Sequence, residues 1–360
     1  MKIAIIGLPN SGKTTVFNAL TRGTAETAAY SSGQLEPNLA TVKVPDARLD
    51  VLARMFNPKK VTPADVQYVD IGGLSSGAGQ SGGLPPALLN YIGGADALLH
   101  VARAFADETV PHPEGRVDLA SDVAAVDLEL AFSDLGIIER RLSKLNSEIG
   151  KISSKDRELR IAERELLVRL QSELEAERPI RDLELSEEEE RILRGYQFLT
   201  AKPLLLVVNV GEEQIKNPPG FAYAHRRSGV VAICGKVEAE LAQLDDEDAQ
   251  AFMDDLGISE AARDRVIAES YELLGLLSFL TTGPDEVRAW TIRRNTPAVE
   301  AAGAIHSDIQ RGFIRAEIVA YDDLIKAGGM NEAKKAGTVR LEGKTYIVKD
   351  GDVCHFLFNV

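Results

Sequence analysis

The sequence predicts an α/β fold with a mostly parallel sheet, an inserted α-helical hairpin and a C-terminal α+β domain. Apolar strand-like runs alternate with helical segments early in the chain, a highly charged stretch almost free of Gly and Pro follows, and short strands return near the C-terminus. At 360 residues the chain is also long for one hydrophobic core. The predicted domains are 1–128 with 201–276 for the α/β part, 129–200 for the hairpin and 277–360 for the C-terminal part.

Six apolar runs are expected to form the parallel sheet. The last two are apolar on both faces, as strands of a parallel sheet require because helices cover both sides. We infer that they join the same sheet as the first four, although the hairpin separates them in the sequence. The six runs are residues 3–6, 40–44, 66–70, 97–101, 204–209 and 230–234.

In the inserted segment, Leu and Ile recur at the three- and four-residue spacing of an α-helix. The series comprises Leu142, Leu145, Ile149 and Ile152, then Leu159, Leu166, Leu170 and Leu174. Two long helices in an antiparallel coiled-coil hairpin, with a turn at Ser153-Ser154, are the simplest arrangement. Ser186 and Glu189 form a predicted capping box for a further helix. The pattern leaves open whether the hairpin is a partner-binding arm or a brace for the sheet.

The part of the chain after the sheet changes character near Leu277. Acidic helices are expected from 238 to 277, the last of them opening at 258–260. A small α+β module then follows, with a helix capped at 296–298. Its expected strands are 287–292, 313–319, 345–348 and 355–360.

The charge of the chain argues against a protein that coats nucleic acid by bulk electrostatics, because such proteins are normally basic. The net charge is −14, and the first 276 residues hold 30 Lys and Arg against 44 Asp and Glu. The remaining residues hold 11 of each and are neutral. This end is the better place for contact with a polyanion, although an ordinary neutral domain explains the balance equally well.

The two cysteines, Cys234 and Cys354, lie far apart and show no metal-binding spacing. Neither a disulfide framework nor a structural zinc site is therefore indicated. The N-terminus enters a strand directly, and no run approaches the roughly 18 apolar residues of a membrane span. We expect a cytoplasmic, monomeric protein without membrane contact.

Residues 7–14 read G-L-P-N-S-G-K-T, a phosphate-binding loop of the form G-x-x-x-x-G-K-[ST]. The motif stands in the context that makes it credible, after a strand and before a helix. Its backbone N–H groups and the helix dipole attract phosphate, Lys13 reaches the terminal phosphates and Thr14 offers a hydroxyl to Mg²⁺. A nucleoside triphosphate site follows from this motif.

A second nucleotide motif, D-x-x-G, is supplied by Asp70 and Gly73 at the end of a predicted strand. Asp70 is expected to support Mg²⁺ directly or through water, and the Gly73 amide to sense the γ-phosphate. The next residue in Ras-like GTPases is a Gln that orients the attacking water, but here it is Leu74. Since Leu makes no hydrogen bond, hydrolysis requires another water-positioning group or is very slow.

Residues 209–212 read N-V-G-E where GTPases carry N-K-x-D. Asn209 is retained, but the Lys that packs on the base and the Asp that accepts the guanine N–H donors are missing. Glu212 is the remaining acceptor that guanine would meet after a rearrangement. The residues themselves therefore indicate a relaxed or altered base preference without selecting ATP.

These motifs, the helical insertion and the C-terminal segments 286–292, 312–317 and 346–352 resemble the YchF, or Obg-like, ATPases along essentially the whole chain. The resemblance implies a translation-factor-class P-loop NTPase fold, a coiled-coil insertion and a C-terminal TGS domain of β-grasp type. It also implies Mg²⁺ as cofactor and ATP as substrate, over or alongside GTP. The implied partners are ribosomes, or a ribosomal subunit, and other translation or stress factors, with RNA contact through the TGS-like domain.

The resemblance also assigns roles to individual residues. Val210 matches the position whose main chain meets adenine, with Asn209 and Glu212 beside it, and Leu74 matches the family's hydrophobic substitution. His112, in the loop 108–115, matches the family's replacement for the missing Gln, since an imidazole can orient or deprotonate water. The family's nucleotide-binding loop corresponds to Asn10, Ser11, Gly12, Lys13, Thr14 and Thr15.

The chain departs from the family at the first switch segment. The usual P-F-C-T is absent before residues 36–38, and Gln34 stands where the Mg²⁺-binding Thr is expected. An amide oxygen can ligate Mg²⁺, and Ser31, Ser32 and Thr41 replace it only if the loop shifts. The prediction is therefore a slow Mg²⁺-dependent ATPase with Lys13, Gly73 and His112 as catalytic groups. A GTPase, or a nucleotide-binding ribosome or RNA adaptor with negligible hydrolysis, is the alternative.

Overall fold

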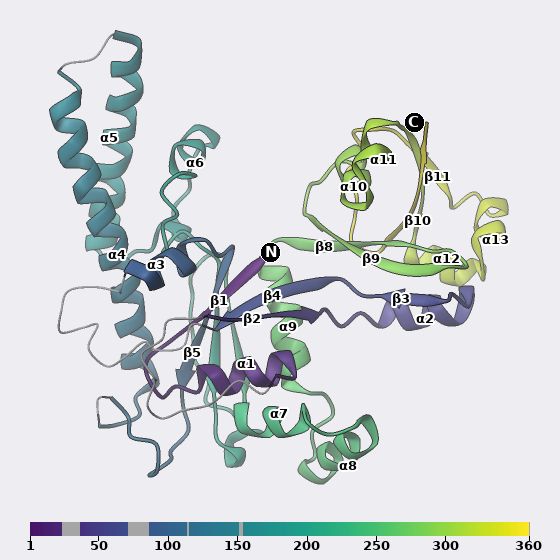
Figure 1. Ribbon diagram of the computed structural model, residues 1–360, viewed down its shortest axis with the longest axis horizontal. Helices are drawn as coiled ribbons and strands as arrows, with labels where there is room; N and C mark the ends of the chain where they lie inside the picture. The colour runs from purple at the N-terminus through teal and green to yellow at the C-terminus, as the bar shows by residue number, and fades with distance from the viewer. Residues whose placement is uncertain (24–36, 71–85, 114, 151–153, 360) are drawn as a thin grey trace. The chain divides into compact units, whose positions relative to one another are not determined.

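The computed structural model describes residues 1–23, 37–70, 86–113, 115–150 and 154–359. The chain divides into two compact units, the first formed by residues 1–40 and 67–266 and the second by 41–66 and 267–360 (Figure 1). The residue boundaries predicted for the domains stay a prediction. None of the helices among the described residues combines the length and apolar composition needed to cross a bilayer.

The first unit is built on a six-stranded sheet in the order β2-β4-β1-β5-β6-β7. β1 pairs in parallel with β4 and β5, and β6 pairs in parallel with β5 and β7. All six predicted strands form and share this sheet, which confirms the predicted α/β class. Their bounds are β1 Lys2–Ile6, β2 Asn38–Lys43, β4 Asp65–Asp70, β5 Ala97–Arg103, β6 Leu204–Asn209 and β7 Ser228–Ile233.

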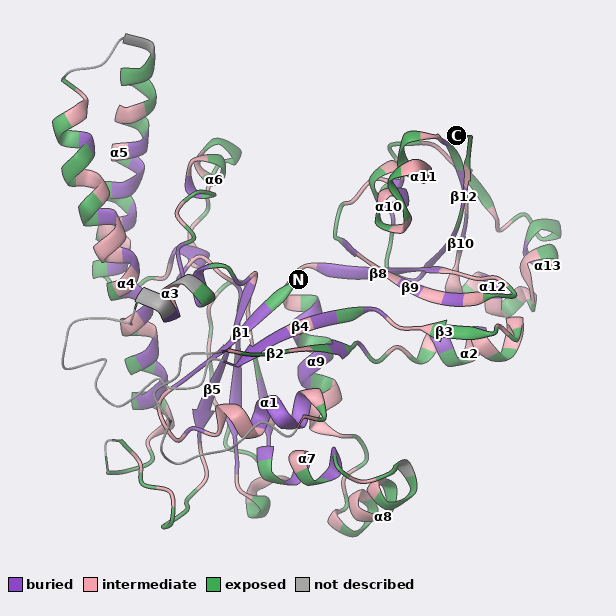
Figure 2. Ribbon diagram, viewed as in Figure 1, coloured by how far each residue is buried: buried purple, intermediate pink, exposed green. Residues whose placement is uncertain are grey.

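The central strands of this sheet are buried on both faces. Every residue of β5 and β6 is buried, and the purple ribbon of β5 in Figure 2 shows this. Apolar side chains from helices complete the core, among them Ile92, Val126 and Leu241. The helices of this part are α1 Lys13–Thr21, α3 Pro86–Gly93, α7 Gly235–Leu241, α8 Asp246–Leu256 and α9 Ala262–Leu273, with a 3₁₀ turn at Glu212–Gln214.

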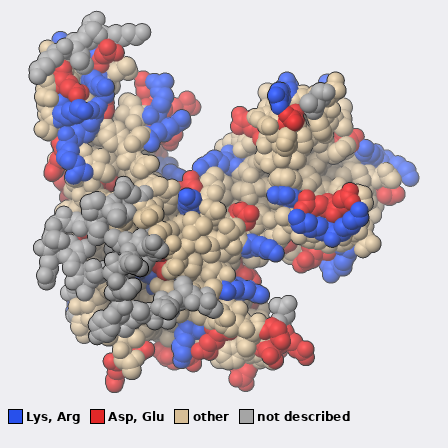
Figure 3. Space-filling model, in the orientation of Figure 1, with Lys and Arg blue, Asp and Glu red and all other residues tan. Residues whose placement is uncertain are grey.

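The inserted segment forms the predicted pair of long helices, α4 Leu119–Glu148 and α5 Ser154–Glu175 (Figure 1). Their shared core includes Leu145, Leu166, Leu170 and Leu174, as the sequence spacing predicted. Away from this core, Lys, Arg, Asp and Glu side chains cover much of the hairpin's visible face (Figure 3). This division between an apolar seam and a charged surface keeps the two helices together.

One predicted member of the seam is wrong. Leu159 is 55% exposed, whereas Glu163, one turn later, is only 9% exposed. The Glu163 carboxylate accepts hydrogen bonds from Arg141 Nε at 2.8 Å and Arg141 Nη2 at 2.9 Å, and a further bond from the Tyr196 hydroxyl. A buried charged group of this kind is tolerated because several donors satisfy it.

The predicted capping box is present at the start of α6 Glu187–Leu193. The Ser186 hydroxyl accepts the Glu189 N–H at 3.3 Å, and the Glu189 carboxylate accepts the Ser186 N–H at 2.8 Å. The latter bond lowers the pKa of Glu189, because it stabilises the ionised carboxylate. Local sequence therefore determines this helix start, as the motif predicted. A 3₁₀ turn at Ile180–Asp182 precedes it.

A buried carboxylate joins the hairpin to the sheet. Asp134 of α4 is completely buried and accepts hydrogen bonds from Leu199 N at 2.9 Å, Thr200 N at 2.8 Å and Thr200 Oγ1 at 2.7 Å. These residues precede β6, so α4 is tied to the segment that leads into the core strand. The hairpin and the sheet thus share one anchor made of hydrogen bonds to a single side chain.

The second unit is an α+β structure with a mixed sheet in the order β11-β10-β12-β8-β9-β3. β8 and β9 form an antiparallel pair, while β12 runs parallel to β8 and β3 parallel to β9. The strands are β3 Lys60–Thr62, β8 Leu276–Thr281, β9 Glu286–Arg293, β10 Phe313–Ala320, β11 Arg340–Glu342 and β12 Asp352–Phe358. The helices are α2 Ala47–Phe56, α10 Ala298–Ile305, α11 Ser307–Arg311, α12 Tyr321–Ala327 and α13 Met330–Lys335.

One local expectation for this unit is wrong, because residues 345–348 form no strand, only a single bridge between Ile347 and Pro297. The helix predicted to begin at 296–298 is confirmed, since α10 starts at Ala298 with Pro297 as its N-cap. The Thr296 hydroxyl donates to the Arg293 carbonyl at 2.6 Å and takes no part in the cap. The assignment of this unit as a β-grasp TGS domain stays a prediction.

Asp134 gives the folded protein a defined pH dependence. Burial outweighs its hydrogen bonds and raises the pKa of Asp134 to about 6, whereas an unfolded Asp titrates near about 3.9. The folded state therefore binds this proton more tightly, so the stabilising contribution is greatest at low pH and is lost as the pH rises from about 4 to 6.

The free energy of unfolding of the wild type minus that of Asp134→Asn should fall by about 1.4 kcal/mol per pH unit in this window and level off above pH about 6.5. Urea titrations followed by far-UV circular dichroism measure the difference. A difference that stays flat between pH 4 and 6 contradicts the prediction.

Candidate functional site

The phosphate loop between β1 and α1 depends on two glycines. Gly7 has φ 146° and Gly12 has φ 89°, in a region that side chains rarely adopt. A Cβ at Gly7 would clash with the Val101 carbonyl oxygen, and one at Gly12 would clash with the Asn209 side chain. Both glycines are therefore required by the close approach of the loop to neighbouring strands. α1 begins at Lys13, which places unpaired helix N–H groups at the loop.

Lys13 closes the loop on itself. Its ammonium group donates to the carbonyl oxygens of Gly7 at 3.0 Å and Leu8 at 2.7 Å. Burial lowers the pKa of Lys13 to about 8, and the negative charge of Asp70 opposes this shift. An anion bound in the loop would compete for the same ammonium group and favour its charged form.

Thr14 and Asp70 face each other across the sheet's carboxyl edge. The Thr14 hydroxyl donates to Asp70 Oδ2 at 2.9 Å, and Asp70 is completely buried. The other carboxylate oxygen, Oδ1, is buried and accepts no hydrogen bond from the described residues. Burial raises the pKa of Asp70 above its usual value, and the Thr14 bond, the Lys13 charge and the Asn38 side chain oppose this shift only in part.

This pair fits a Mg²⁺ ion. Mg²⁺ binds through one or two protein oxygens together with phosphate oxygens and water, and a hydroxyl beside a carboxylate with an unused oxygen provides such a set. The described residues contain no group of three or more His, Cys, Asp or Glu side chains that would hold a metal by themselves. Thr14 and Asp70 are therefore suited to a metal that arrives with a phosphate ligand.

Asn209 clamps the loop from the neighbouring strand end. Its Nδ2 donates to the Ser11 carbonyl at 3.0 Å, and its Oδ1 accepts the Gly235 N–H at 3.0 Å. Asn209 is only 4% exposed, so both hydrogen bonds are shielded from water. Asn209 thus joins the loop after β1 to the start of α7, and a contact with a bound base is not needed to explain it.

The two residues predicted for base recognition lie in different settings. Val210 is buried, and its N–H donates to the Ile233 carbonyl at 2.9 Å, so that N–H belongs to the sheet. Glu212 is exposed and accepts a hydrogen bond from Lys236 Nζ at 2.7 Å. Recognition of guanine through Glu212 would have to compete with Lys236 for this carboxylate.

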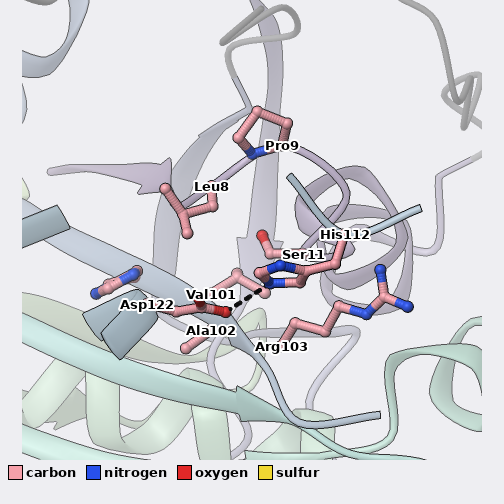
Figure 4. A pocket seen from close by; sticks show the side chains of 9 residues that line it. Leu8, Pro9, Ser11, Val101, Ala102, Arg103, His112 and Asp122 are labelled. Atoms are coloured by element: carbon pink, nitrogen blue, oxygen red, sulfur yellow. Dashed lines mark hydrogen bonds and ion pairs between the residues drawn. The ribbon is translucent and has the colours of Figure 1, made fainter. Parts of the chain in front are cut away.

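His112 is buried beside the phosphate loop. Its Nε2 lies 2.9 Å from Asp122 Oδ2, and both side chains are 5% exposed. Figure 4 shows the pair in a pocket whose wall also contains Leu8, Pro9 and Ser11 of the phosphate loop. The predicted water-positioning residue is therefore adjacent to the nucleotide loop, and its ring is held by a carboxylate.

Arg103, the last residue of β5, was not predicted from the sequence. Its guanidinium donates to the carbonyl oxygens of Phe105 at 3.1 Å, Val110 at 3.0 Å and Asp107 at 3.2 Å, and lies 4.4 Å from the centre of the Phe105 ring. It thereby holds the loop that carries His112. The available signal was an Arg two positions after the strand predicted at residues 97–101.

Two protein-family models match this chain, one over its N-terminal part and the other over its C-terminal part. A family model described as a 50S ribosome-binding GTPase matches residues 2–133. The C-terminal model of the YchF GTPases, described as a protein of unknown function (DUF933), matches residues 276–359. The Bacillus subtilis protein named ribosome-binding ATPase YchF is 44% identical over 99% of this chain and 98% of its own length.

The chain belongs to the YchF family. The resemblance inferred from the motifs is thereby confirmed. The Caenorhabditis elegans protein named Obg-like ATPase 1 is 38% identical and covers 100% of this chain and 92% of its own length. The solved structure of the Schizosaccharomyces pombe YchF GTPase superposes with a TM-score of 0.84 at 31% identity, over 99% of this chain and 97% of that one.

The YchF fold brings most of the predicted site residues together at one edge of the sheet. The loop residues follow β1, Asp70 ends β4 and Asn209 ends β6, as expected for ligand sites at the carboxyl ends of parallel strands. Asn10 also touches the His112 loop, because its Nδ2 donates to the Pro111 carbonyl at 2.9 Å. Gln34, Gly73 and Leu74 lie outside the described residues, so their predicted roles are untested.

Replacing Asn209 tests the clamp. Asn209→Ala removes both hydrogen bonds and leaves the buried Gly235 N–H without a partner, which costs roughly 1–3 kcal/mol. We expect ATP affinity to fall by about 10- to 100-fold, since the loop loses its support. Isothermal titration calorimetry measures this, with the exposed Asn217→Ala as matched control. Equal affinities of the two variants would contradict the clamp.

Proposed function

We propose that this YchF-family chain is an Mg²⁺-dependent P-loop ATPase that couples its nucleotide state to the ribosome. The observation that carries the proposal is the convergence of Lys13, Thr14 and Asp70 at the end of β1 and β4. Support comes also from bacterial relatives that are named ribosome-binding ATPases and share over 40% of their sequence with this chain. Ligand binding here would use groups that the fold already holds in place.

Each residue of the loop has a separate task in the proposed reaction. Lys13 stabilises charge on the terminal phosphates after it leaves the loop carbonyls, and the N–H groups at the start of α1 bind phosphate oxygens. Thr14 and Asp70 would hold Mg²⁺, and the bound ion would neutralise charge on the phosphates. Gly73 would sense the γ-phosphate, and Gln34 would be the further metal ligand.

We propose His112 as the group that orients the attacking water, in place of the Gln that Leu74 replaces. Its ring lies in the pocket formed by Leu8, Pro9 and Ser11, within the same unit as the phosphate loop. An imidazole both donates and accepts hydrogen bonds, which an aliphatic side chain cannot do. Because His112 lies in a loop, the position of its ring depends on contacts that a bound partner is able to change. Without a partner the ring is not held at the attacking water, so ATP turnover is slow.

ATP is the proposed nucleotide, with GTP as the second candidate. The pairing of Glu212 with Lys236 favours ATP, because guanine would need an acceptor that this ion pair already occupies. The first family model and the yeast structure are both described as GTPases, and they support GTP as the second candidate. A third candidate, an adaptor that binds nucleotide and the ribosome without hydrolysis, differs from the others only in turnover.

The partner contacts proposed for the C-terminal part include RNA.

A competition titration of ATP against GTP tests the nucleotide preference. ATP should bind more tightly to the wild type, and Lys13→Ala should lower ATP affinity by about 10- to 100-fold because it removes a charged phosphate donor. Lys216→Ala, an exposed lysine of the same unit, is the control. Chelation of Mg²⁺ with EDTA should abolish hydrolysis. Tighter binding of GTP would instead establish the GTPase, and an unchanged Lys13→Ala variant would disprove the site.

Hydrolysis with and without ribosomes tests the catalytic role of His112. We expect ribosomes to raise the wild-type rate, and His112→Ala to lower the ribosome-stimulated kcat by about 100-fold while ATP affinity stays unchanged, as for loss of an acid–base group. His306→Ala, an exposed histidine of the second unit, is the control. Binding to ribosomes without any turnover would identify an adaptor.

A further inference from the structure

The carboxylate of Asp122 is buried beside the imidazole of His112, next to the phosphate loop and in a pocket that Arg103 also lines. Asp122 is 3% exposed as a residue, and its Oδ2 contacts His112 Nε2 at 2.9 Å. A buried polar pair of this kind contributes little net stability, because desolvation cancels most of the attraction, and apolar residues would fill the space as well. The pair is therefore better explained by what it does to the orientation of the ring.

The two partners are held by elements of different rigidity. Asp122 lies in the first turns of α4, which is fixed to the sheet's core by the three hydrogen bonds of Asp134. His112 instead lies in a loop, whose backbone is held by Arg103 and Asn10. The carboxylate is thus the fixed member of the pair and the imidazole the adjustable one.

A carboxylate on one ring nitrogen determines two properties of a histidine. It fixes the plane of the ring, and it determines which nitrogen carries the proton when the imidazole is neutral. Both properties decide whether the other side of the ring is able to orient a water molecule. In this chain the carboxylate that sets them comes from α4, the helix that forms the first arm of the hairpin.

We propose that Asp122 is the positioning residue for His112 in ATP hydrolysis. The inference rests on the proposed role of His112 and adds the group through which α4 controls it. Asp122 itself touches neither phosphate nor water in this scheme. It acts only by holding the imidazole, so its loss has no effect in a protein that lacks His112.

The experiment measures ribosome-stimulated ATP hydrolysis by the full chain in wild type, His112→Ala, Asp122→Asn and the double variant. Asp122→Asn should lower kcat by about tenfold and leave KM within about twofold. The double variant should be no slower than His112→Ala, because the two residues act as one unit. Asp122→Glu, which keeps the carboxylate on a longer side chain, should give a kcat between those of wild type and Asp122→Asn.

Asp127→Asn is the matched control, because it changes a partly buried carboxylate of the same helix that is bonded to Tyr223 and not to His112. Its kcat should equal that of the wild type. Thermal melting identifies variants that do not fold. If Asp122→Asn does not fold, Asp122→Glu replaces it in the test. A kcat of Asp122→Glu below the wild-type value at unchanged KM then supports the proposal, and a wild-type kcat of Asp122→Glu overturns it.

The failure of this inference is distinct from the failure of the proposed function. A slow His112→Ala with a wild-type rate for Asp122→Asn overturns the positioning role and leaves His112 in the mechanism. Additive losses in the double variant also overturn it, since Asp122 would then act independently. A wild-type rate for His112→Ala removes His112 from hydrolysis and the positioning role with it.

Discussion

Three parallel strands of the first unit, β4, β5 and β6, end in buried polar side chains, and the candidate site depends on how these are satisfied. Asp70, Arg103 and Asn209 are 0, 2 and 4% exposed and end β4, β5 and β6. A buried polar group is costly unless it is hydrogen-bonded. Arg103 and Asn209 meet that requirement by binding a neighbouring loop or helix start, whereas Asp70 binds the Thr14 hydroxyl through Oδ2 and leaves its buried Oδ1 without a hydrogen bond from the described residues. The loops are thereby brought to one edge of the sheet.

The partners of the three side chains divide the site into separate functions. Asp70 accepts the Thr14 hydroxyl and has a second carboxylate oxygen without a hydrogen bond from the described residues, Arg103 holds the His112 loop through backbone carbonyls, and Asn209 supports the phosphate loop. The ends of these strands thus supply a carboxylate beside the phosphate loop, the loop anchor and the clamp. In β5 and β6 the register places Arg103 directly opposite Asn209, so the two anchors are adjacent.

The hairpin follows the same rule, because polar groups determine where its helices meet the rest of the unit. Glu163 interrupts the apolar seam and is held by Arg141 and Tyr196, and Asp134 binds the segment before β6. Leucine spacing gives the two helices their apolar seam, but these side chains determine register and attachment. Asp122 lies in the first turn of α4, so the first helix of the hairpin contributes to the pocket that contains His112.

Several features were predictable because they depend on neighbours in the sequence. The phosphate loop, the six strands and the Ser186 capping box follow from local patterns, and each strand and the capping box has the predicted place in the structure. The addition of β3 to the C-terminal sheet beside β9 was not predictable, because it joins residues more than 200 positions apart by backbone hydrogen bonds that carry no sequence signature.

The sequence by itself determined the family, the α/β class and the loop that binds phosphate, since glycine geometry and apolar periodicity act over a few residues. Only the tertiary structure decided that His112 meets Asp122, that Arg103 anchors its loop and that Leu159 is exposed while Glu163 is buried. Those outcomes depend on which polar groups become buried together. Burial is a property of the whole fold, because a charged side chain looks alike in the sequence whether solvent or a partner satisfies it.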